Sequence, residues 1–589
     1  MKHLFKNSLL AFLLLYGSLG TTLAQNIGGA GPQVGETSNG EVSLDTLNVH
    51  LAIPIVSKAG IGVPVSVVMT YDSNVWYPVV GGYAYWYPGN VSNPQQFWHA
   101  ASPLGVLVVG QSIGCGQMVQ ALPVLGFTDA SGSTHRLDSP INLSVGGADG
   151  NYCTGNVDHA TVLLTDGSGL TLNIQAGGGY SVVTSSGVTI QAPSLTSPAS
   201  GATDADGNTI SLASGSTTTL TDTLEVQGLS YNSWCSASGS QVFTYPTSTG
   251  TANVTVNCTN YTLQTNFGCA NITEYGPNSG QYLPTTITVP DGTYTFTYES
   301  LVSGTITGRI SSVTYPSGKV TSYLYTGANH GINCADGSSM GLTVTKSDAV
   351  SQYTRNTSAH TTTLVSDYGT GHANNTSVFT FAQHIFFQGN LGPYFLTQTV
   401  ENQGTGTQLR TTLYCYNTNQ TNCATTAPVP PLTQTDVYST LAGMSASSRI
   451  SSTYDSYGNV TMSAVYDFGA GTPTRKTVYS GYGYTWNGST SSPNCTALIG
   501  NSIMNKTCRA QLETGAGAQL RNVYSQYSPT GHAIKIGTLV NGSYVTTSAT
   551  YNANGSIASS TDANSNPTTV TEGDCNGGVV HPSRTGHGS

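Results

Sequence analysis

The sequence predicts an all-β protein in which antiparallel β-hairpins form a curved sheet or partial shell, preceded by an irregular N-terminal β domain. A short turn phrase recurs along the chain, and apolar residues alternate with polar ones over strand-sized stretches. Sustained helical periodicity is confined to the N-terminal signal peptide. Because a single hairpin cannot bury a face alone, several in succession indicate a stacked array.

The recurring phrase is an aromatic residue, an Asp-like residue, two spacers and a glycine. In the clearest copies a tyrosine precedes the glycine by four residues, which gives the pairs Tyr454/Gly458, Tyr527/Gly531 and Tyr551/Gly555. A side chain such as that of Asp455 accepts hydrogen bonds from backbone N–H groups at the start of a tight turn, and glycine adopts the positive φ that closes it. Looser copies lie at Phe127–His135, Asp204–Ile210 and Thr314–Ser322.

Strand-sized alternation supports the same fold class. Gly292–Glu299, Lys319–Tyr325 and Ser377–Phe387 each place apolar residues on one face of an extended chain. The one helix candidate is Ala497–Glu513, and its β-branched and Asn content disfavours a helix.

The turn phrases resemble the YD repeat of the Rhs family, bacterial shell-forming proteins related to toxin-complex shells and to teneurins. The strongest matches are Tyr454–Asn459 and Tyr551–Gly555, and Val42–Pro78 is similar to the N-terminal segment of such proteins. The chain departs from the pattern where Asn552 replaces the Asp and Ser565 replaces the Gly. The resemblance implies a hollow shell used for cargo encapsulation, contact-dependent antagonism or adhesion, of which this chain looks like the N-terminal part.

Composition changes along the chain predict its organisation. The expected parts are a signal peptide (1–24), a flexible leader (25–40), an N-terminal β-rich domain (41–289), a β-hairpin region (290–426), a Pro-rich break (427–432), YD-repeat hairpins (433–572) and a disordered C-terminal tail (573–589).

The first residues predict export. Lys2 and Lys6 form a basic region, Ser8–Tyr16 is apolar, and small residues precede a cleavage site after Ala24. The apolar run is short for a bilayer span, so no permanent membrane span is expected. We expect an exported protein in the extracellular space, at the cell surface or in the periplasm.

Charged residues are only 7% of the chain, with 17 Lys+Arg against 27 Asp+Glu. No basic patch exists that could neutralise a row of phosphates, so nucleic acid is excluded as a partner. The 34 tyrosines suit a wet β-surface or a cavity lining, because the ring is apolar and the hydroxyl forms hydrogen bonds.

Eleven cysteines in an exported chain predict disulfides, although spacing does not fix their connectivity. The spacing of three cysteine pairs is typical of hairpin or loop staples: Cys258/Cys269, Cys415/Cys423 and Cys495/Cys508. Because eleven is odd, at least one cysteine is unpaired or bridges two chains, and Cys575 is the candidate. The sequence contains no Cys-x2-Cys pair, so no metal site and no cofactor are expected.

No catalytic residue is assigned. Ser112 lies in a Gly-x-Ser-x-Gly pattern, but the residues after it are a poor helix start for a nucleophile elbow. Glu299 and Asp291 flank a strand without an evident acid partner for glycoside hydrolysis.

An aromatic cluster is the best candidate for recognition. Trp76, Tyr85, Trp86 and Trp98 could stack on sugar faces, whereas the favoured alternative is a domain-edge plug or a core patch packed against the hairpin array. The sequence therefore predicts a secreted, noncatalytic YD-repeat scaffold that contacts glycans, cell-envelope components or a partner protein. A secreted polysaccharide-active hydrolase and a sugar-binding adhesin are the alternatives.

Overall fold

A computed structural model describes residues 40–571 and 583–584, apart from 59–61, 80–82, 89–96, 101–103, 111–112, 117–118, 131–132, 146–156, 233–234, 236–237, 248–249, 367–373, 386–390, 418–421 and 499–501. Over these residues the one helical element is a 3-10 turn, Ala328–Gly331, and the remaining regular structure is strand. The predicted all-β fold class is confirmed. The helix candidate Ala497–Glu513 contains most of strand β38 (Thr507–Thr514) and the end of β37 (Cys495–Ala497).

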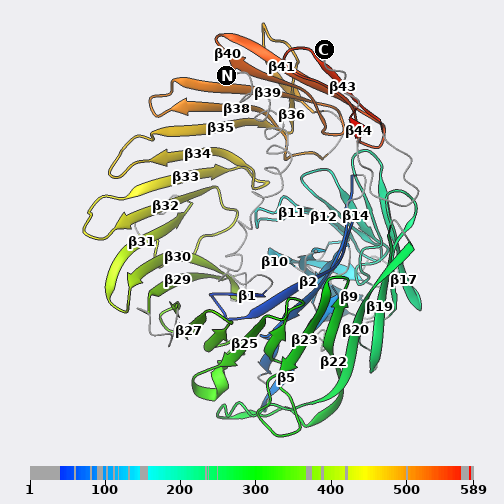
Figure 1. The fold of residues 1–589 in the computed structure, drawn as a ribbon, viewed down its shortest axis with the longest axis vertical. Coiled ribbons are helices and arrows are strands. Elements are labelled where there is room, and N and C mark those ends of the chain that lie inside the picture. Colours follow the sequence, from blue (N-terminus) through cyan, green and yellow to red (C-terminus); the bar gives the residue numbers. More distant parts are fainter. Residues whose placement is uncertain are drawn as a thin grey trace.

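Thirty-one strands form one antiparallel sheet in which nearly every strand pairs with the next along the chain. Figure 1 shows this sheet curling around the molecule from cyan through green and yellow to red, with the blue N-terminal strands inside it. We call this curled sheet the wall. Its first arc comprises β11 (His159–Leu163), β12 (Thr171–Gln175), β13 (Tyr180–Val183), β14 (Thr189–Ala192), β15 (Gly201–Thr203), β16 (Thr209–Ala213), β17 (Thr217–Thr221), β18 (Gln227–Asn232), β19 (Gly239–Thr247) and β20 (Gly250–Leu263).

The rest of the wall continues by antiparallel pairing of successive strands, through connections that are mostly short. The second arc comprises β22 (Asn278–Val289), β23 (Gly292–Tyr298), β24 (Ile310–Thr314), β25 (Val320–Tyr325), β26 (Gly341–Thr345), β27 (Val350–Asn356), β28 (Thr361–Val365), β29 (Thr376–Ile385), β30 (Leu391–Gln403) and β31 (Thr407–Tyr416). The third comprises β32 (Gln434–Leu441), β33 (Ser448–Tyr454), β34 (Val460–Tyr466), β35 (Arg475–Tyr482), β38, β39 (Gln519–Tyr527), β40 (Ala533–Val540), β41 (Ser543–Tyr551), β42 (Ile557–Thr561), β43 (Pro567–Thr571) and β44 (Ser583–Arg584).

Four small sheets accompany the wall. The first, which we call the inner sheet, orders β1 (Gly40–Val42), β2 (Val49–Lys58), β3 (Val65–Asp72) and β6 (Trp98–Ala100). The others comprise β7 (Val106–Val109), β8 (Ile113–Gly116), β9 (Val119–Thr128) and β10 (Thr134–Val145); β4 (Trp76–Val79), β5 (Ala84–Pro88) and β21 (Ile272–Thr273); and β36 (Tyr484–Trp486) with β37.

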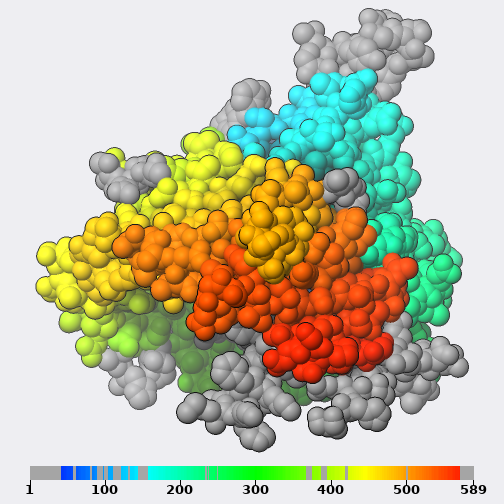
Figure 2. Space-filling model, turned by 90° about the horizontal axis from the view of Figure 1, so that it is seen from above, coloured from blue at the N-terminus to red at the C-terminus, as the bar shows by residue number. Residues whose placement is uncertain are grey.

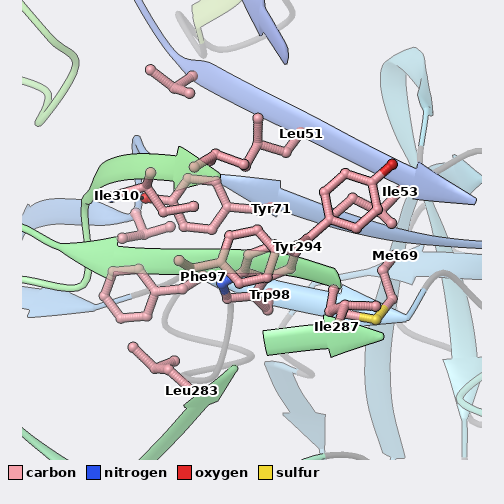
Figure 3. Packing of buried hydrophobic residues seen from close by; sticks show 14 of the residues in the cluster. Leu51, Ile53, Met69, Tyr71, Phe97, Trp98, Leu283, Ile287, Tyr294 and Ile310 are labelled. Carbon is pink, nitrogen blue, oxygen red and sulfur yellow. Dashed lines mark hydrogen bonds between the residues drawn. The ribbon is translucent and has the colours of Figure 1, made fainter. Parts of the chain in front are cut away.

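The main core lies between the inner sheet and the wall. In β2 the alternate residues Val49, Leu51 and Ile53 are buried, whereas their neighbours are exposed or half-buried. In β23 the buried set is the aromatic series Tyr294, Phe296 and Tyr298. This period of two gives each strand one apolar face, and burial of each large side chain contributes about 1.5–3 kcal/mol. Figure 3 shows side chains of the inner sheet interleaved with those of the wall strands.

Two predicted boundaries do not interrupt the wall. Strands β22 and β23, on either side of residue 290, pair as a hairpin in which Val289 opposes Gly292. Strands β31 and β32 also pair directly, so Ala427–Leu432 is a loop beside a continuous sheet and the expected break there is wrong. Pro residues in a loop remove no ladder hydrogen bond.

The two ends of the chain lie mostly outside the described residues. These include the signal peptide, the cleavage site after Ala24 and the leader up to residue 39. Of the tail expected to be disordered, Ser583 and Arg584 pair with β43, which corrects the prediction for those two residues.

Candidate functional site

The repeated turns have one common geometry. Asp455 Oδ1 accepts hydrogen bonds from the N–H groups of Tyr457 and Asn459, both at 2.9 Å. Gly458 adopts a φ of 77°, and the glycines of the other two clear copies, Gly531 and Gly555, adopt 84° and 83°. The expected turn chemistry is therefore present: a side-chain acceptor opens the turn and a positive φ closes it.

The same geometry appears where the sequence departs from the pattern. Asp562 Oδ1 accepts from the N–H groups of Asn564 and Asn566, both at 2.9 Å. Ser565 takes the place of the glycine at a φ of 66°. The turn is thus specified mainly by its first residue, and a non-glycine residue is accommodated at the closing position with some strain.

The tyrosines of the repeat lie where the pairing register between two strands shifts. Tyr454, Tyr527 and Tyr551 each end a strand, and each lies at a shift of pairing register just before the turn. Two of the hydroxyls donate to a carbonyl at the start of the preceding strand, from Tyr527 to Thr507 at 3.0 Å and from Tyr551 to Ala533 at 3.1 Å.

Two further tyrosines also donate to the preceding strand, Tyr482 to Val460 at the start of β34 at 2.8 Å and Tyr416 to Leu396 within β30 at 2.7 Å. Each of these bonds joins the end of one strand to the strand before it. Tyrosine is thus used as a brace between adjacent strands, which accounts for part of its abundance.

Repeat turns of the last strands meet turns of the first arc, and we call this contact the seam. Asn208 Nδ2 donates to the carbonyl of Asn554 at 3.0 Å, and His532 Nε2 lies 2.6 Å from Asp206 Oδ2. The ring of His532 stacks on Tyr551 with 4.5 Å between centroids. Figure 2 shows the orange and red hairpins next to cyan residues of the first arc.

Backbone contacts extend the seam. The N–H of Met504 donates to the carbonyl of Ser185 at 2.7 Å, and Ser186 forms an isolated bridge with Ile503. At the turn of β33 and β34, a Cβ on Gly458 would lie only 2.1 Å from the carbonyl oxygen of Gly167. The seam is therefore close-packed, and its glycines permit backbone to approach backbone.

The predicted ligand-binding tryptophans are buried. Trp76, Trp86 and Trp98 are only 1%, 0% and 2% exposed, so stacking of a sugar on these three rings is wrong. They form the core patch that was the favoured alternative: Trp76 and Trp86 both pack edge-on to Phe267, at 6.1 and 5.3 Å. Only Tyr85 of the predicted set, 43% exposed, presents a ring to solvent.

Indole and phenol groups fasten the inner sheet and the neighbouring strand β4 to the wall. Trp76 Nε1 donates to the carbonyl of Thr307 at 2.8 Å, and Trp98 Nε1 donates to the hydroxyl of Tyr298 at 2.9 Å. The hydroxyl of Tyr71 accepts from the N–H of Ile310 at 2.7 Å. Burial raises the pKa of the Tyr71 phenol well above its usual value, so it stays neutral in this contact.

A buried ion pair beneath this region was not found from the sequence. Arg309 Nε and Nη2 donate to the two carboxylate oxygens of Glu299, each at 2.7 Å, and the Arg309 side chain is 2% exposed. The guanidinium lies 4.1 Å from the ring centroid of Tyr325. Ten residues separate the two partners, and only the hairpin geometry brings them together, so no motif could have shown the pair.

Four disulfides are formed among the described residues. The expected pairs Cys415–Cys423 and Cys495–Cys508 are present. The expected pair Cys258–Cys269 is wrong, because the structure joins Cys235 to Cys258 and Cys269 to Cys334. Cys235 lies beside β19, whose Gly239 opposes Cys258, and this proximity is set by strand pairing rather than by spacing. Cys575 lies outside the described residues.

The candidate catalytic groups do not assemble. Glu299 is engaged by Arg309, Asp291 lies in the turn between β22 and β23, and Ser112 is outside the described residues. No group of three or more His, Cys, Asp or Glu side chains that could hold a metal ion occurs in the part of the chain that the structure describes.

Histidine–aspartate pairs join distant segments. His384 Nε2 lies 2.7 Å from Asp138 Oδ1, and His135 Nδ1 lies 2.7 Å from Asp166 Oδ2. Burial lowers the pKa of His135, but the hydrogen bonds and charges of Asp129 and Asp166 outweigh it and raise this pKa to about 9. His135 is therefore a cation at neutral pH, held between two carboxylates.

These features define an all-β protein with a curled antiparallel wall, closed by a seam of turns around an inner sheet. No helix among the described residues is long and apolar enough to cross a membrane. No family model matches the sequence, and no curated protein matches it.

Solved structures give distant similarities. The chain is similar to a chain of the Photorhabdus luminescens Tc holotoxin pore, at 10% identity and a TM-score of 0.25, over 88% of this chain and 27% of that one. It is also similar to a chain of the TcdB2-TccC3-Cdc42 complex, at 9% identity and a TM-score of 0.24, over 88% of this chain and 28% of that one. A porin-like protein from Bacteroides uniformis matches at 10% identity and a TM-score of 0.17, over 57% of this chain and 90% of that one.

Proposed function

We propose that the chain is a secreted, noncatalytic scaffold of the YD-repeat, Rhs-like type. Its wall forms part of a β-shell, and its outer surface contacts glycans, cell-envelope components or a partner protein. One observation carries the proposal: copies of the repeated turn close the wall upon itself, as in the contact between Asn208 and Asn554. The repeat is thereby used for assembly of a wall and not for chemistry.

The polar groups of the molecule favour this role over catalysis. Asp455 and Asp562 belong to repeat turns, where their carboxylate oxygens accept hydrogen bonds from backbone N–H groups. Glu299 is paired with Arg309. A retaining or inverting glycosidase needs two carboxyl groups about 5–10 Å apart on either side of a sugar, with one held protonated. Because these three acids are bound to backbone N–H groups or to Arg309, they do not provide such a pair of catalytic carboxyl groups.

Closure of the wall is tested by small-angle scattering of the mature chain, residues 25–589, and of an Asn208→Ala/Asp206→Ala variant. We expect a compact particle for the wild type and an enlarged radius of gyration for the variant, because both side-chain contacts across the seam are removed. Thr209→Ala, at the first residue of β16 next to this turn but outside these contacts, is the control. An elongated wild-type particle would contradict the proposed wall.

Export and the lack of catalysis are tested separately. Expression with the native signal peptide should give a mature chain that begins at Gln25 in the exported fraction, as read by N-terminal sequencing. The purified protein should release no reducing sugar from microbial or plant polysaccharides. Turnover that copurifies with the chain and disappears in Asp291→Asn would replace the scaffold with a hydrolase.

Surface contact is tested by sedimentation of the purified protein with cell envelopes. We expect the mature chain to pellet with the envelopes, and to remain in solution after they are stripped of glycans by periodate. Retention by stripped envelopes would point to a protein partner instead.

A further inference from the structure

The segment that joins β25 to β26 lines a groove of about 550 Å³ on the wall. This segment, residues 326–340, is called the groove loop. The groove also includes Gln352 and Thr354 of β27. Its volume is within the range of small-ligand sites in proteins. Neither the turn repeats nor the seam involves these residues.

The groove loop has an unusual backbone. Asn329 and His330 follow one another in the left-handed conformation, at φ values of 54° and 51°. Each such residue costs about 1–2 kcal/mol when it is not glycine, so two in succession require support from the surrounding structure. Strained backbone of this kind occurs preferentially at ligand sites, where it fixes side chains in position.

Contacts on several sides hold the groove loop in this shape. Arg309 Nη2 donates to the carbonyl of His330 at 2.9 Å, and a disulfide joins Cys334 to Cys269. Ser339 donates from its backbone to Thr46 and from its hydroxyl to Asn74, at 3.0 and 2.9 Å. The inner sheet, the buried ion pair and a disulfide thus all fix one loop. A site fixed in advance loses little entropy when it binds a ligand.

The lining offers paired donors and acceptors. Asn329, Asn333 and Gln352 each place a primary amide at the groove. Asn329 Nδ2 donates to Cys334 Sγ at 3.1 Å, and Asn333 Oδ1 accepts from the N–H of Ala335 at 3.0 Å. Because an amide nitrogen has a second N–H and an amide oxygen a second lone pair, both groups retain bonding capacity for a ligand. Among the described residues the amide of Gln352 makes no side-chain hydrogen bond. Half-buried Met340 adds an apolar surface at the same groove. Hydroxyl groups of a sugar are both donors and acceptors, and the C–H face of its ring packs on apolar surface, so these chemistries match.

The charge of the lining favours a neutral ligand. Arg355 is the one ionic residue that lines the groove. Its guanidinium is already bound on the buried side of the wall, through Nη1 to Ser338 and through Nη2 to the hydroxyl of Tyr394 at 3.4 Å. The groove therefore does not direct a cationic side chain at an acidic ligand.

We propose that this groove binds a short neutral oligosaccharide through the amides of Asn329, Asn333 and Gln352. The inference deepens the glycan contact of the proposed function and assigns it to one place. The inference rests on the glycan contact of the proposed function. The scaffold role does not depend on this groove.

Binding is measured by saturation-transfer NMR and calorimetry on the full mature chain. The probes are cellotetraose, maltotetraose, xylotetraose and diacetylchitobiose, with trigalacturonate as the acidic probe and a Gly/Ser peptide as the polypeptide probe. We expect one of the neutral sugars to bind and the other two classes to give no signal. Tighter binding of trigalacturonate or of the peptide, or no binding at all, would overturn the assignment of ligand class.

Variants locate the site. Asn329→Gly removes the amide while glycine accepts the positive φ, so folding is preserved, and the dissociation constant should rise about fivefold. Gln352→Ala should act similarly. Asn541→Gly, at a φ of 48° in the distant turn between β40 and β41, is the matched control and should change nothing. Wild-type affinity in both groove variants would overturn the groove as the site, while the glycan contact itself would stand.

Discussion

Two glutamate–arginine pairs of the same geometry differ in burial, and this difference predicts a large gap in stability. Arg309 holds both oxygens of Glu299, and Arg410 likewise holds both oxygens of Glu401. The side chains are 2% and 14% exposed in the first pair and 48% and 36% exposed in the second. Replacing each glutamate by glutamine removes the charge and keeps the shape.

The expected magnitudes follow from solvation. Glu299→Gln leaves the Arg309 cation buried without a counterion, which destabilises a protein by about 3–5 kcal/mol. It also replaces an acceptor of the Thr307 hydroxyl, now at 2.8 Å from Glu299 Oε2. Glu401→Gln leaves Arg410 in water, and exposed pairs contribute only about 0.2–1 kcal/mol.

Urea unfolding followed by tryptophan fluorescence measures both changes. Trp76 is a suitable reporter because its indole donates to Thr307 in the same region. We expect a clearly lower midpoint for Glu299→Gln and a nearly unchanged midpoint for Glu401→Gln. Equal shifts in the two variants would refute the argument that burial sets the strength of this pair.

Three other predictions follow from contacts described above. Gly458→Ala should destabilise the seam by about 1–3 kcal/mol more than Gly542→Ala in thermal unfolding, because both glycines have positive φ but only the first is packed against a carbonyl. The raised pKa of His135 means that its contribution to stability is complete below about pH 6.5 and is lost as the pH rises through about 9; His135→Asn should flatten this decline in melts from pH 6 to 10. Peptide mapping without reduction should recover the pairs Cys235–Cys258 and Cys269–Cys334, and a Cys258–Cys269 peptide would contradict the fold of this region.

The local part of this structure could be predicted from the sequence. Turn geometry at Asp455 and Gly458 depends on five successive residues, and strand alternation depends on neighbours two apart. Both signals act within a short window, so the all-β class and the hairpins could be derived. The turn at Ser565 is the informative exception, since the acceptor Asp562 kept the turn where the glycine was missing.

Contacts between distant segments could not be predicted in this way. The wrong pairing of Cys258 and the burial of Trp76 both depend on which strands lie side by side. A cluster of tryptophans has the same composition on a binding face and in a core. Whether its rings are buried depends on how the wall strands pack around it. The seam contact of Asp206 with His532 spans 326 residues and has no local signal at all.

The position of the inner sheet has a consequence for biosynthesis. Tyr71 is separated by 239 residues from Ile310, to which its hydroxyl is bonded. At roughly 5–20 residues per second, the ribosome needs on the order of 10–50 s to reach that partner. During this delay the apolar face of the nascent sheet is exposed to water and prone to non-native association. A holdase that recognises extended, alternating hydrophobic segments would act on the newborn chain in this interval.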